Sequence, residues 1–292
     1  MRHFWKSVAI AKSLRAAGIL VALLVSYSGI VLAGNPLLTN DPETPGRNGW
    51  EVNLSHNMAF SLPAFRQALP LANVNYGTSE KNQWKISVPV IENDPRPGGE
   101  HWGIGDVQLG WKYRFLEEDE HGIQASIYPQ PLLPTGNAAL GLGNDRFELF
   151  IPGQIGRHFC DDKLFLYGEV GHNFVFDGST QHSWFFGAAA EYQVTEKIEL
   201  VSEIVRISFP NNNGTEDFLF NAGVNVRLSK HVVLQTAFGR TFFDEASGAP
   251  FFSSYVGLHI TWGGDEDEVE EEKRAPVSGR KAWLPRSPAL WR

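Results

Sequence analysis

The stretch FSSYVGLHITW, residues 252–262, alternates between two kinds of side chain at successive positions. The even-numbered positions run from Phe252 through Leu258 to Trp262 and are mostly apolar, whereas odd-numbered positions such as His259 are small or polar. A period of two indicates a β-strand with one apolar face, and about 9–11 residues suffice to cross a bilayer at a tilt. An open sheet edge cannot satisfy its backbone groups in hydrocarbon. We therefore expect this strand to pair with the first strand and close a barrel.

The same alternation recurs from residue 50 onward and predicts about twelve strands, an even number as in single-chain bacterial outer-membrane barrels. Connections after the even-numbered strands are short, while the others are mostly longer and richer in Gly, Pro and Asn. Short periplasmic turns that alternate with long outer loops are typical of these barrels. The predicted fold class is therefore all-β, a transmembrane antiparallel up-and-down β-barrel. The predicted strands are 50–60, 69–77, 82–91, 104–116, 122–133, 145–159, 163–176, 182–193, 197–208, 216–228, 231–240 and 252–262.

The N-terminus has the features of a signal peptide. A basic region precedes an apolar core at 16–25, and small or apolar residues lead to a cleavage site after Ala33. The alternative is an uncleaved membrane anchor. Cleavage would take the formal net charge from −8 to −12, and an acidic exported chain is poorly suited to nucleic acid. The predicted organisation is a signal peptide (1–33), an extended periplasmic lead-in (34–49), the barrel (50–262) and a charged, disordered periplasmic tail (263–292).

Charged side chains of the predicted strands fall almost entirely on the polar face. A Lys or Arg on the lipid face at mid-membrane costs about 2–4 kcal/mol, so these groups are expected to face the lumen. Arg206 is an exception by parity and fits only near the outer interface. The charges either pair with one another to fill and stiffen the barrel or select a passing solute. The lumen-lining candidates are Glu51, Lys85, Lys112, Arg114, Glu148, Glu169, Glu191, Glu199, Glu203 and Arg227.

No catalytic or metal-binding constellation is recognisable, and we predict a protein that is not an enzyme and needs no cofactor or metal. The nine His residues lack the spacing of metal ligands on one element. His172 and Asn173 beside Ser179 come nearest to a Ser/His/Asn lipase site but lack its Asn-Gly and paired Ser. The expected partners are outer-membrane lipid, a small-molecule solute and, through strand 252–262, the outer-membrane assembly machinery; no nucleic acid is expected.

Several phrases resemble one known family. They are NPLLTNDPETPG (35–46) followed by GWEVN (49–53), NYG (75–77), GDVQLGWKYRF (105–115), YPQ (128–130) running into LPTGN (133–137), and GLG (141–143). Together they resemble the meta-pathway phenol-degradation family, whose members are transporter-like outer-membrane β-barrels. The resemblance covers roughly 35–262. It implies a barrel in a Gram-negative outer membrane that passes small compounds, often aromatic or hydrophobic ones, and it carries over no catalytic residues.

The sequence therefore predicts an outer-membrane channel or transporter that passes small solutes by diffusion through a polar, mixed-charge lumen. The alternative is a non-conducting barrel with a structural or surface-binding role, because barrels of modest strand number can be filled by side chains. Small inward positions such as Gly110 and Gly187 favour an open path, while Tyr128 and Tyr167 favour filling.

Overall fold

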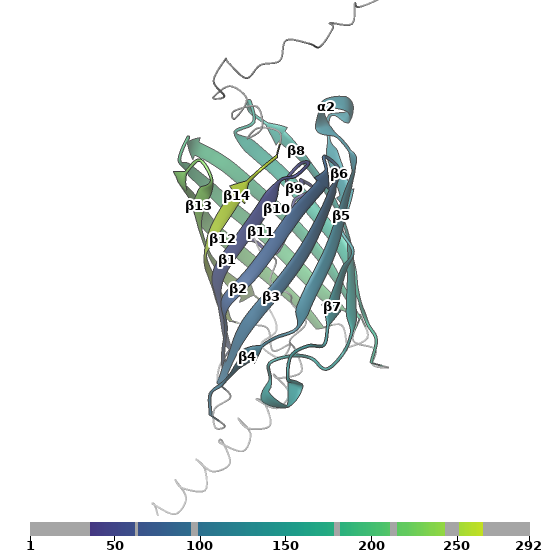
Figure 1. The fold of residues 1–292 in the computed structure, drawn as a ribbon, viewed down its shortest axis with the longest axis vertical. Coiled ribbons are helices and arrows are strands. Elements are labelled where there is room, and N and C mark those ends of the chain that lie inside the picture. The colour runs from purple at the N-terminus through teal and green to yellow at the C-terminus, as the bar shows by residue number, and fades with distance from the viewer. Residues whose placement is uncertain are drawn as a thin grey trace, which may run out of the picture.

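The computed structural model describes residues 36–61, 64–94, 99–177, 182–210, 215–242 and 251–264. The predicted signal peptide and nearly all of the predicted tail lie outside these residues. Strand segments of the described chain form one sheet that closes on itself (Figure 1). The elements are β1 (Trp50–Ser61), β2 (Ala64–Ser79), β3 (Asn82–Asp94), β4 (His101–Ile104), β5 (Val107–Leu116), α2 (Glu118–His121), β6 (Gln124–Ile127), β7 (Gln130–Leu133), η1 (Ala138–Leu140), β8 (Glu148–Phe159), β9 (Leu164–Val175), β10 (Ser183–Thr195), β11 (Ile198–Phe209), β12 (Thr215–Ser229), β13 (Val232–Phe242) and β14 (Phe252–Trp262).

The barrel closes where β14 meets β1. The two strands run antiparallel, with Trp50 opposite Trp262 and Phe60 opposite Phe252. Every residue of β1 between these two ends has a partner on β14, so the seam is as fully paired as any other part of the sheet. The predicted pairing of the last strand with the first is confirmed.

Two of the barrel strands are each divided into two segments. Both β4 and β5 pair with β3, and both β6 and β7 pair with β5 and β8. The break between β6 and β7 falls at Pro129, which has no backbone N–H to give to the ladder. With each pair counted as one strand the barrel has twelve, as predicted, although 104–116 and 122–133 are not the continuous strands expected from the pattern.

β2 departs most from its predicted bounds. The sequence placed this strand at 69–77, whereas the structure begins it at Ala64 and ends it at Ser79. The pairing with β3 shifts register between Ala68 and Leu71, around a proline that breaks the alternation on which the prediction rested. Beyond this irregularity the strand resumes its period of two.

The two ends of the barrel differ in their connections. Apart from the two-residue link between β1 and β2, the short connections lie at the end that carries α2, uppermost in Figure 1, which we call the turn end. The longer connections, including the one with η1, lie at the opposite, loop end. The acidic connection after β5 forms the single helical turn α2, which ends at Gly122 in a left-handed conformation (φ 73°).

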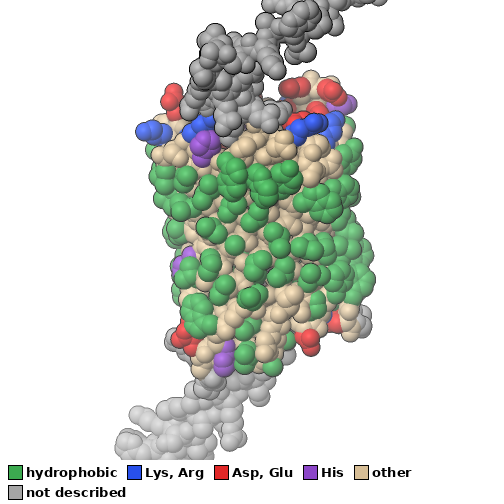
Figure 2. All heavy atoms as spheres, viewed as in Figure 1, with side chains coloured by type: hydrophobic (Ala, Val, Ile, Leu, Met, Phe, Trp, Pro, Cys, Tyr) green, Lys and Arg blue, Asp and Glu red, His purple; other side chains and the backbone are tan. Residues whose placement is uncertain are grey.

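The outer wall carries an apolar belt between two charged rims (Figure 2). Aromatic rings lie at both edges of the belt. At the turn end the ring centroid of Trp50 lies 4.5 Å from that of Tyr76 and 6.0 Å from that of Trp262. At the loop end Phe60 lies 5.1 Å from the ring of Phe65. Aromatic girdles around an apolar band are the signature of a transmembrane barrel. Within the described residues, no helix is long and apolar enough to span a membrane.

Arg206 lies on the outer face, as its parity predicts. Its guanidinium is half exposed, pairs with the carboxylate of Glu216 on β12 and lies 6.0 Å from the ring of Phe186. The residue is close to the loop end of β11, so the charge can reach the rim instead of the centre of the belt.

A charge placed in the middle of the belt is expected to destabilise the barrel. Leu258 is exposed and faces Leu54 on β1 and Leu234 on β13. Leu258→Arg should lower the free energy of unfolding by about 2–4 kcal/mol, as for Arg at a bilayer midplane, measured by urea unfolding in phospholipid vesicles. Ser229→Arg, at the turn end, is the control and should cost less than about 1 kcal/mol. Equal costs for the two variants would contradict the membrane placement.

Candidate functional site in the barrel lumen

Residues 36–49, which we call the inner segment, run from the turn-end rim, where Asn48 and Gly49 hydrogen-bond to Gly77 on β2, into the barrel. The backbone N–H groups of Leu38 and Thr39 donate to the Glu203 carboxylate at 2.7 and 2.8 Å, and Thr39 Oγ1 donates to it at 2.7 Å. The Asn40 N–H donates to Glu169 at 2.7 Å. The predicted periplasmic lead-in is therefore corrected: its described part enters the lumen, because two buried carboxylates accept its backbone hydrogen bonds.

Apolar contacts hold the same segment against the same wall, formed by β9, β10 and β11. Leu37, 1% exposed, packs with a cluster that includes Tyr167 and Val201. Leu38 packs against a second cluster around Val205. A Cβ on Gly187 would come 2.3 Å from Thr39 Oγ1, so this position requires a glycine where the segment approaches the wall. The apolar residues on the inner face of β11 are thus explained by the segment that covers them.

Lys112 ties the inner segment to the opposite wall. Its Nζ donates to the carbonyl oxygens of Asp41 and Glu43, both at 2.8 Å, and lies 3.6 Å from the Asp41 carboxylate. Nearer the turn end, Thr44 Oγ1 donates to the Glu80 carbonyl at 2.6 Å. The segment therefore runs from the β2–β3 turn into the middle of the barrel.

A second contact joins the segment to α2. Glu118 accepts the backbone N–H of His158 at 2.7 Å and its Nδ1 at 2.9 Å, and Gln124 Nε2 bridges Glu118 and Glu43 at 3.3 and 3.2 Å. Burial raises the pKa of the Glu118 carboxyl, but the hydrogen bonds from His158 outweigh it and hold that pKa below its ordinary value. An ionised Glu118 thus fixes the turn-end mouth.

The connection between β7 and β8 folds inward at the loop end. The Asp106 carboxylate accepts the backbone N–H groups of Gly136 and Asn144 at 2.9 and 2.7 Å. Asn93 Nδ2 donates to the Leu140 carbonyl at 3.1 Å, and Leu142 packs against Ala68, Leu71 and Ile91 on the inner wall. This loop narrows the loop-end mouth.

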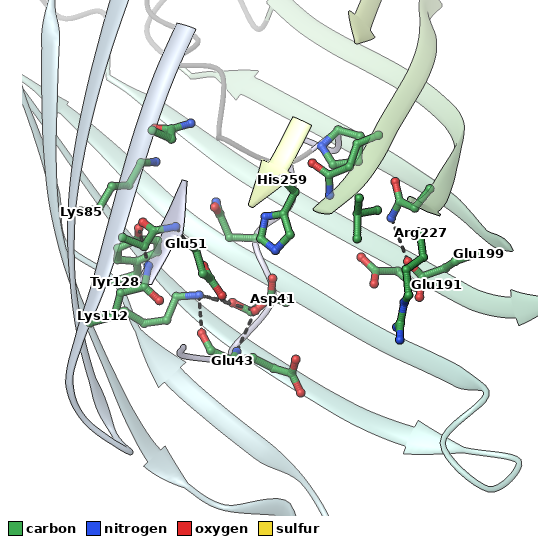
Figure 3. A pocket seen from close by; sticks show the side chains of 18 residues that line it. Asp41, Glu43, Glu51, Lys85, Lys112, Tyr128, Glu191, Glu199, Arg227 and His259 are labelled. Carbon is green, nitrogen blue, oxygen red and sulfur yellow. Dashed lines mark hydrogen bonds and ion pairs between the residues drawn. The ribbon is translucent and has the colours of Figure 1, made fainter. Parts of the chain in front are cut away.

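Between the inner segment and the wall lies a cavity of about 400 Å³ (Figure 3). Lys85, Lys112 and Tyr128 lie on one side of it, and Glu191, Glu199 and Arg227 lie on the other. Of the predicted lumen residues, those that line this cavity are Glu51, Lys85, Lys112, Glu191, Glu199 and Arg227.

The other four predicted residues lie elsewhere on the inner side. Glu169 and Glu203 hold the inner segment, as described above. Glu148 is 2% exposed and accepts from Arg146 at 2.8 Å and from Asn173 at 2.7 Å, near the inward-folded loop. Arg114 lies at the turn end, 3.2 Å from the Glu117 carboxylate and 3.0 Å from the Glu80 carbonyl. The lumen thus brings six of the ten together and uses the rest as anchors.

The acids that line the cavity each accept a hydrogen bond or pair with a cation. Glu51 accepts a hydrogen bond from Asn75 Nδ2 at 3.1 Å. Glu191 accepts one from Tyr167 Oη at 2.8 Å, and Glu199 accepts one from Asn225 Nδ2 at 2.8 Å. Asp41 and Glu43 have the contacts given above. Of the three Lys and Arg side chains that line the cavity, Lys85 and Arg227 have fewer hydrogen-bond partners than Lys112. Lys85 is 6% exposed, and its Nζ reaches Gln130 Oε1 at only 3.4 Å. Arg227 makes no side-chain hydrogen bond or ion pair with another described residue.

Buried amides add unused hydrogen-bonding atoms to the same wall. Asn73 is fully buried, and neither its Nδ2 nor its Oδ1 bonds to another described residue. The Oδ1 atoms of Asn75 and Asn225 also lack partners. A buried polar atom without a partner costs about 1–3 kcal/mol, so this wall suits a polar ligand or water. Sequence reasoning missed Asn73 and Asn75 because it considered only charged residues, although their parity on β2 marks them as inward.

Metal binding finds no structural support: the described ranges hold no cluster of three or more His, Cys, Asp or Glu side chains that could bind a metal ion. Of the lipase-like grouping, only His172 and Asn173 are described. His172 is packed against the rings of Phe174, His182 and Trp184, and Ser179 lies outside the described residues.

Comparison with known proteins places the fold. No family model matches the chain, and no curated protein matches its sequence. Among solved structures, an outer membrane channel from Pseudomonas putida F1 is 13% identical, with 76% of this chain and 98% of that chain covered and a TM-score of 0.61. The KdgM porin is 8% identical, with 73% of this chain and 99% of that chain covered and a TM-score of 0.51. The KdgM porin in complex with disordered oligogalacturonate has the same identity and coverages and a TM-score of 0.52.

At these identities the likeness is one of fold, and the structures compared are channels and porins. The closed barrel and its apolar belt make this chain an outer-membrane β-barrel of porin-like architecture, the type found in Gram-negative bacteria. Membership of the meta-pathway phenol-degradation family stays a prediction.

Removal of the main anchor should loosen the inner segment. Glu203→Ala deletes the acceptor of Leu38 and Thr39, and hydrogen bonds to a charged group are worth about 1.5–3 kcal/mol each. We expect the backbone amides of residues 36–41 to exchange with solvent about tenfold faster or more, measured by hydrogen–deuterium exchange of the folded protein. Glu199→Ala is the matched control on the same strand and should leave this exchange unchanged. Equal protection in both variants would show that Glu203 does not hold the segment.

Proposed function

We propose that the protein is a diffusion channel that passes small solutes, including aromatic or hydrophobic ones, through the lumen of the barrel. The observation that carries the proposal is the cavity of about 400 Å³ lined by charged and amide side chains. A barrel built only for stability would gain by filling this space with apolar side chains, since unpaired polar groups cost free energy. The cavity instead holds ionisable groups of both signs next to unpartnered amides.

The inner segment and the inward loop also support the alternative, a barrel that conducts nothing. Leu37 is buried among wall side chains, and Leu142 packs into the loop-end mouth. These contacts leave a narrow lumen, and passage along it depends on how firmly the segment and loop are held. The two functions therefore make different predictions for the same physical measurement.

Single-channel recording in a planar bilayer tests the proposal. The refolded mature protein should give discrete conductance steps. Arg227→Ala should raise the preference for cations because it removes a positive charge from the cavity, and Glu199→Ala should lower it because it removes a negative one. Each shift of the reversal potential should shrink as salt rises, since the Debye length falls from about 10 Å at 0.1 M to 3 Å at 1 M. Lys197→Ala, in a turn, is the control for both variants.

Two results would count against the channel. One is a barrel shown to be folded and inserted that gives no conductance steps, which favours the structural role. The other is conductance whose selectivity is the same in Arg227→Ala and Glu199→Ala, which would place the ion path outside this cavity.

A further inference from the structure

One wall of the cavity carries an ammonium group whose N–H donors are not all used in hydrogen bonds to described residues. Lys85 carries three N–H donors and is buried, and within the described residues its Nζ makes one hydrogen bond, the long 3.4 Å contact with Gln130 Oε1. Lys112, the neighbouring ammonium, is already occupied by the Asp41 and Glu43 carbonyl oxygens. Both ammonium groups lie over the ring of Tyr128, at 5.8 and 4.9 Å from its centroid. Lys85 is thus the buried cation of this wall that still has unused donors.

Next to this cation lies a pair of amides with unused atoms. Asn75 is directly opposite Lys85 in the β2–β3 register, and Asn73 is opposite Ser87, one inward position along. Diagonal neighbours across two strands are about 7–8 Å apart. Asn73 offers an unpartnered donor and an unpartnered acceptor, and Asn75 offers an unpartnered acceptor. A hydroxyl group both donates and accepts, so it matches these amides.

We propose that the cavity binds a small hydroxylated monocarboxylate, with its carboxylate on Lys85 and its hydroxyl groups on Asn73 and Asn75. This inference rests on the proposed function and names a solute class for the same cavity. A single carboxylate is what one unsatisfied ammonium can pair with. The cavity is lined by five acids and three Lys or Arg residues, so a second negative charge on the solute would be repelled.

Arg227 gives the solute a second contact on the other side of the cavity. It is exposed, close to the turn end of β12, and has no side-chain partner among the described residues. In Figure 3 it lies across the cavity from Lys85. A carboxylate can therefore pass from the buried cation to the exposed one as it moves toward the turn end.

Thermal unfolding of the full mature protein in detergent tests the site without reference to conductance. Sodium gluconate is the probe, sorbitol is the uncharged match, and sodium chloride at equal ionic strength controls for salt. A ligand that binds only the folded state raises the unfolding midpoint with concentration. Gluconate should raise it beyond both controls. Lys85→Gln should weaken the apparent affinity about tenfold or more, as expected for a charge-assisted contact, whereas Lys85→Arg should retain most of it.

Lys81→Gln, in the β2–β3 turn and 3.6 Å from Glu117, is the matched control and should bind gluconate like the unaltered protein. If Lys85→Gln does not fold, as judged by heat-modifiable migration on gels, Asn73→Ala replaces it. That change removes two unpartnered atoms and should lower the affinity severalfold. A gluconate effect no larger than that of sodium chloride overturns the proposal. So does an effect that survives Lys85→Gln, or Asn73→Ala where that variant replaces it.

Single-channel recording, set beside the gluconate titration, separates the channel function from the binding site. If the folded protein gives no conductance but is stabilised by gluconate, the channel function is rejected and the binding site is supported. If the protein conducts but is not stabilised by gluconate, the channel function is supported and the binding site is rejected.

Discussion

The structure depends on one constraint: no backbone N–H or C=O can be left unpaired in the bilayer. The seam between β14 and β1 meets it with register maintained from Trp50 opposite Trp262 to Phe60 opposite Phe252. Closure then assigns every side chain to one of two environments by parity. The apolar belt faces lipid and the polar positions face inward, so the composition of the lumen follows from the need to close the sheet.

Closure creates a second problem, because an interior lined by carboxylates and amides must satisfy them. The inner segment solves part of it by presenting backbone N–H groups to Glu203 and Glu169 and carbonyl oxygens to Lys112. The backbone is a suitable partner because it offers both donors and acceptors regardless of sequence. Leu37 and Leu38 add apolar contacts on the inner face of β9–β11. The segment therefore occupies part of the lumen and, in the same place, supplies hydrogen-bond partners to the charged side chains of the wall.

The sequence predicted the closed barrel, its strand number and its seam, because a period of two and the parity of loop lengths are local signals. It failed where a local signal is absent. Residues 36–49 have no period, and their place in the lumen depends on Glu169 and Glu203, more than 100 positions away in the sequence. The break before Gln130 was missed because apolar side chains continue at odd-numbered positions through it. The break before Val107 does change the phase of the alternation, from Ile104 to Val107, but a short shift of this kind was read as one strand. Parity also identified inward charges, yet it cannot tell which of them are already paired.

That distinction separates the two roles that the sequence left open for the charges. Five of the charged side chains have close partners and act mainly in stiffening the barrel and holding the inner segment: Glu148, Glu169, Glu203, Lys112 and Arg114. Lys85 and Arg227 have no such close partner in the part of the chain that the structure describes. A buried or confined cation without a close anion raises the local affinity for one. Filling and selection are therefore not competing descriptions of this lumen: the paired charges build the walls of a cavity, and the unpaired ones determine what it attracts.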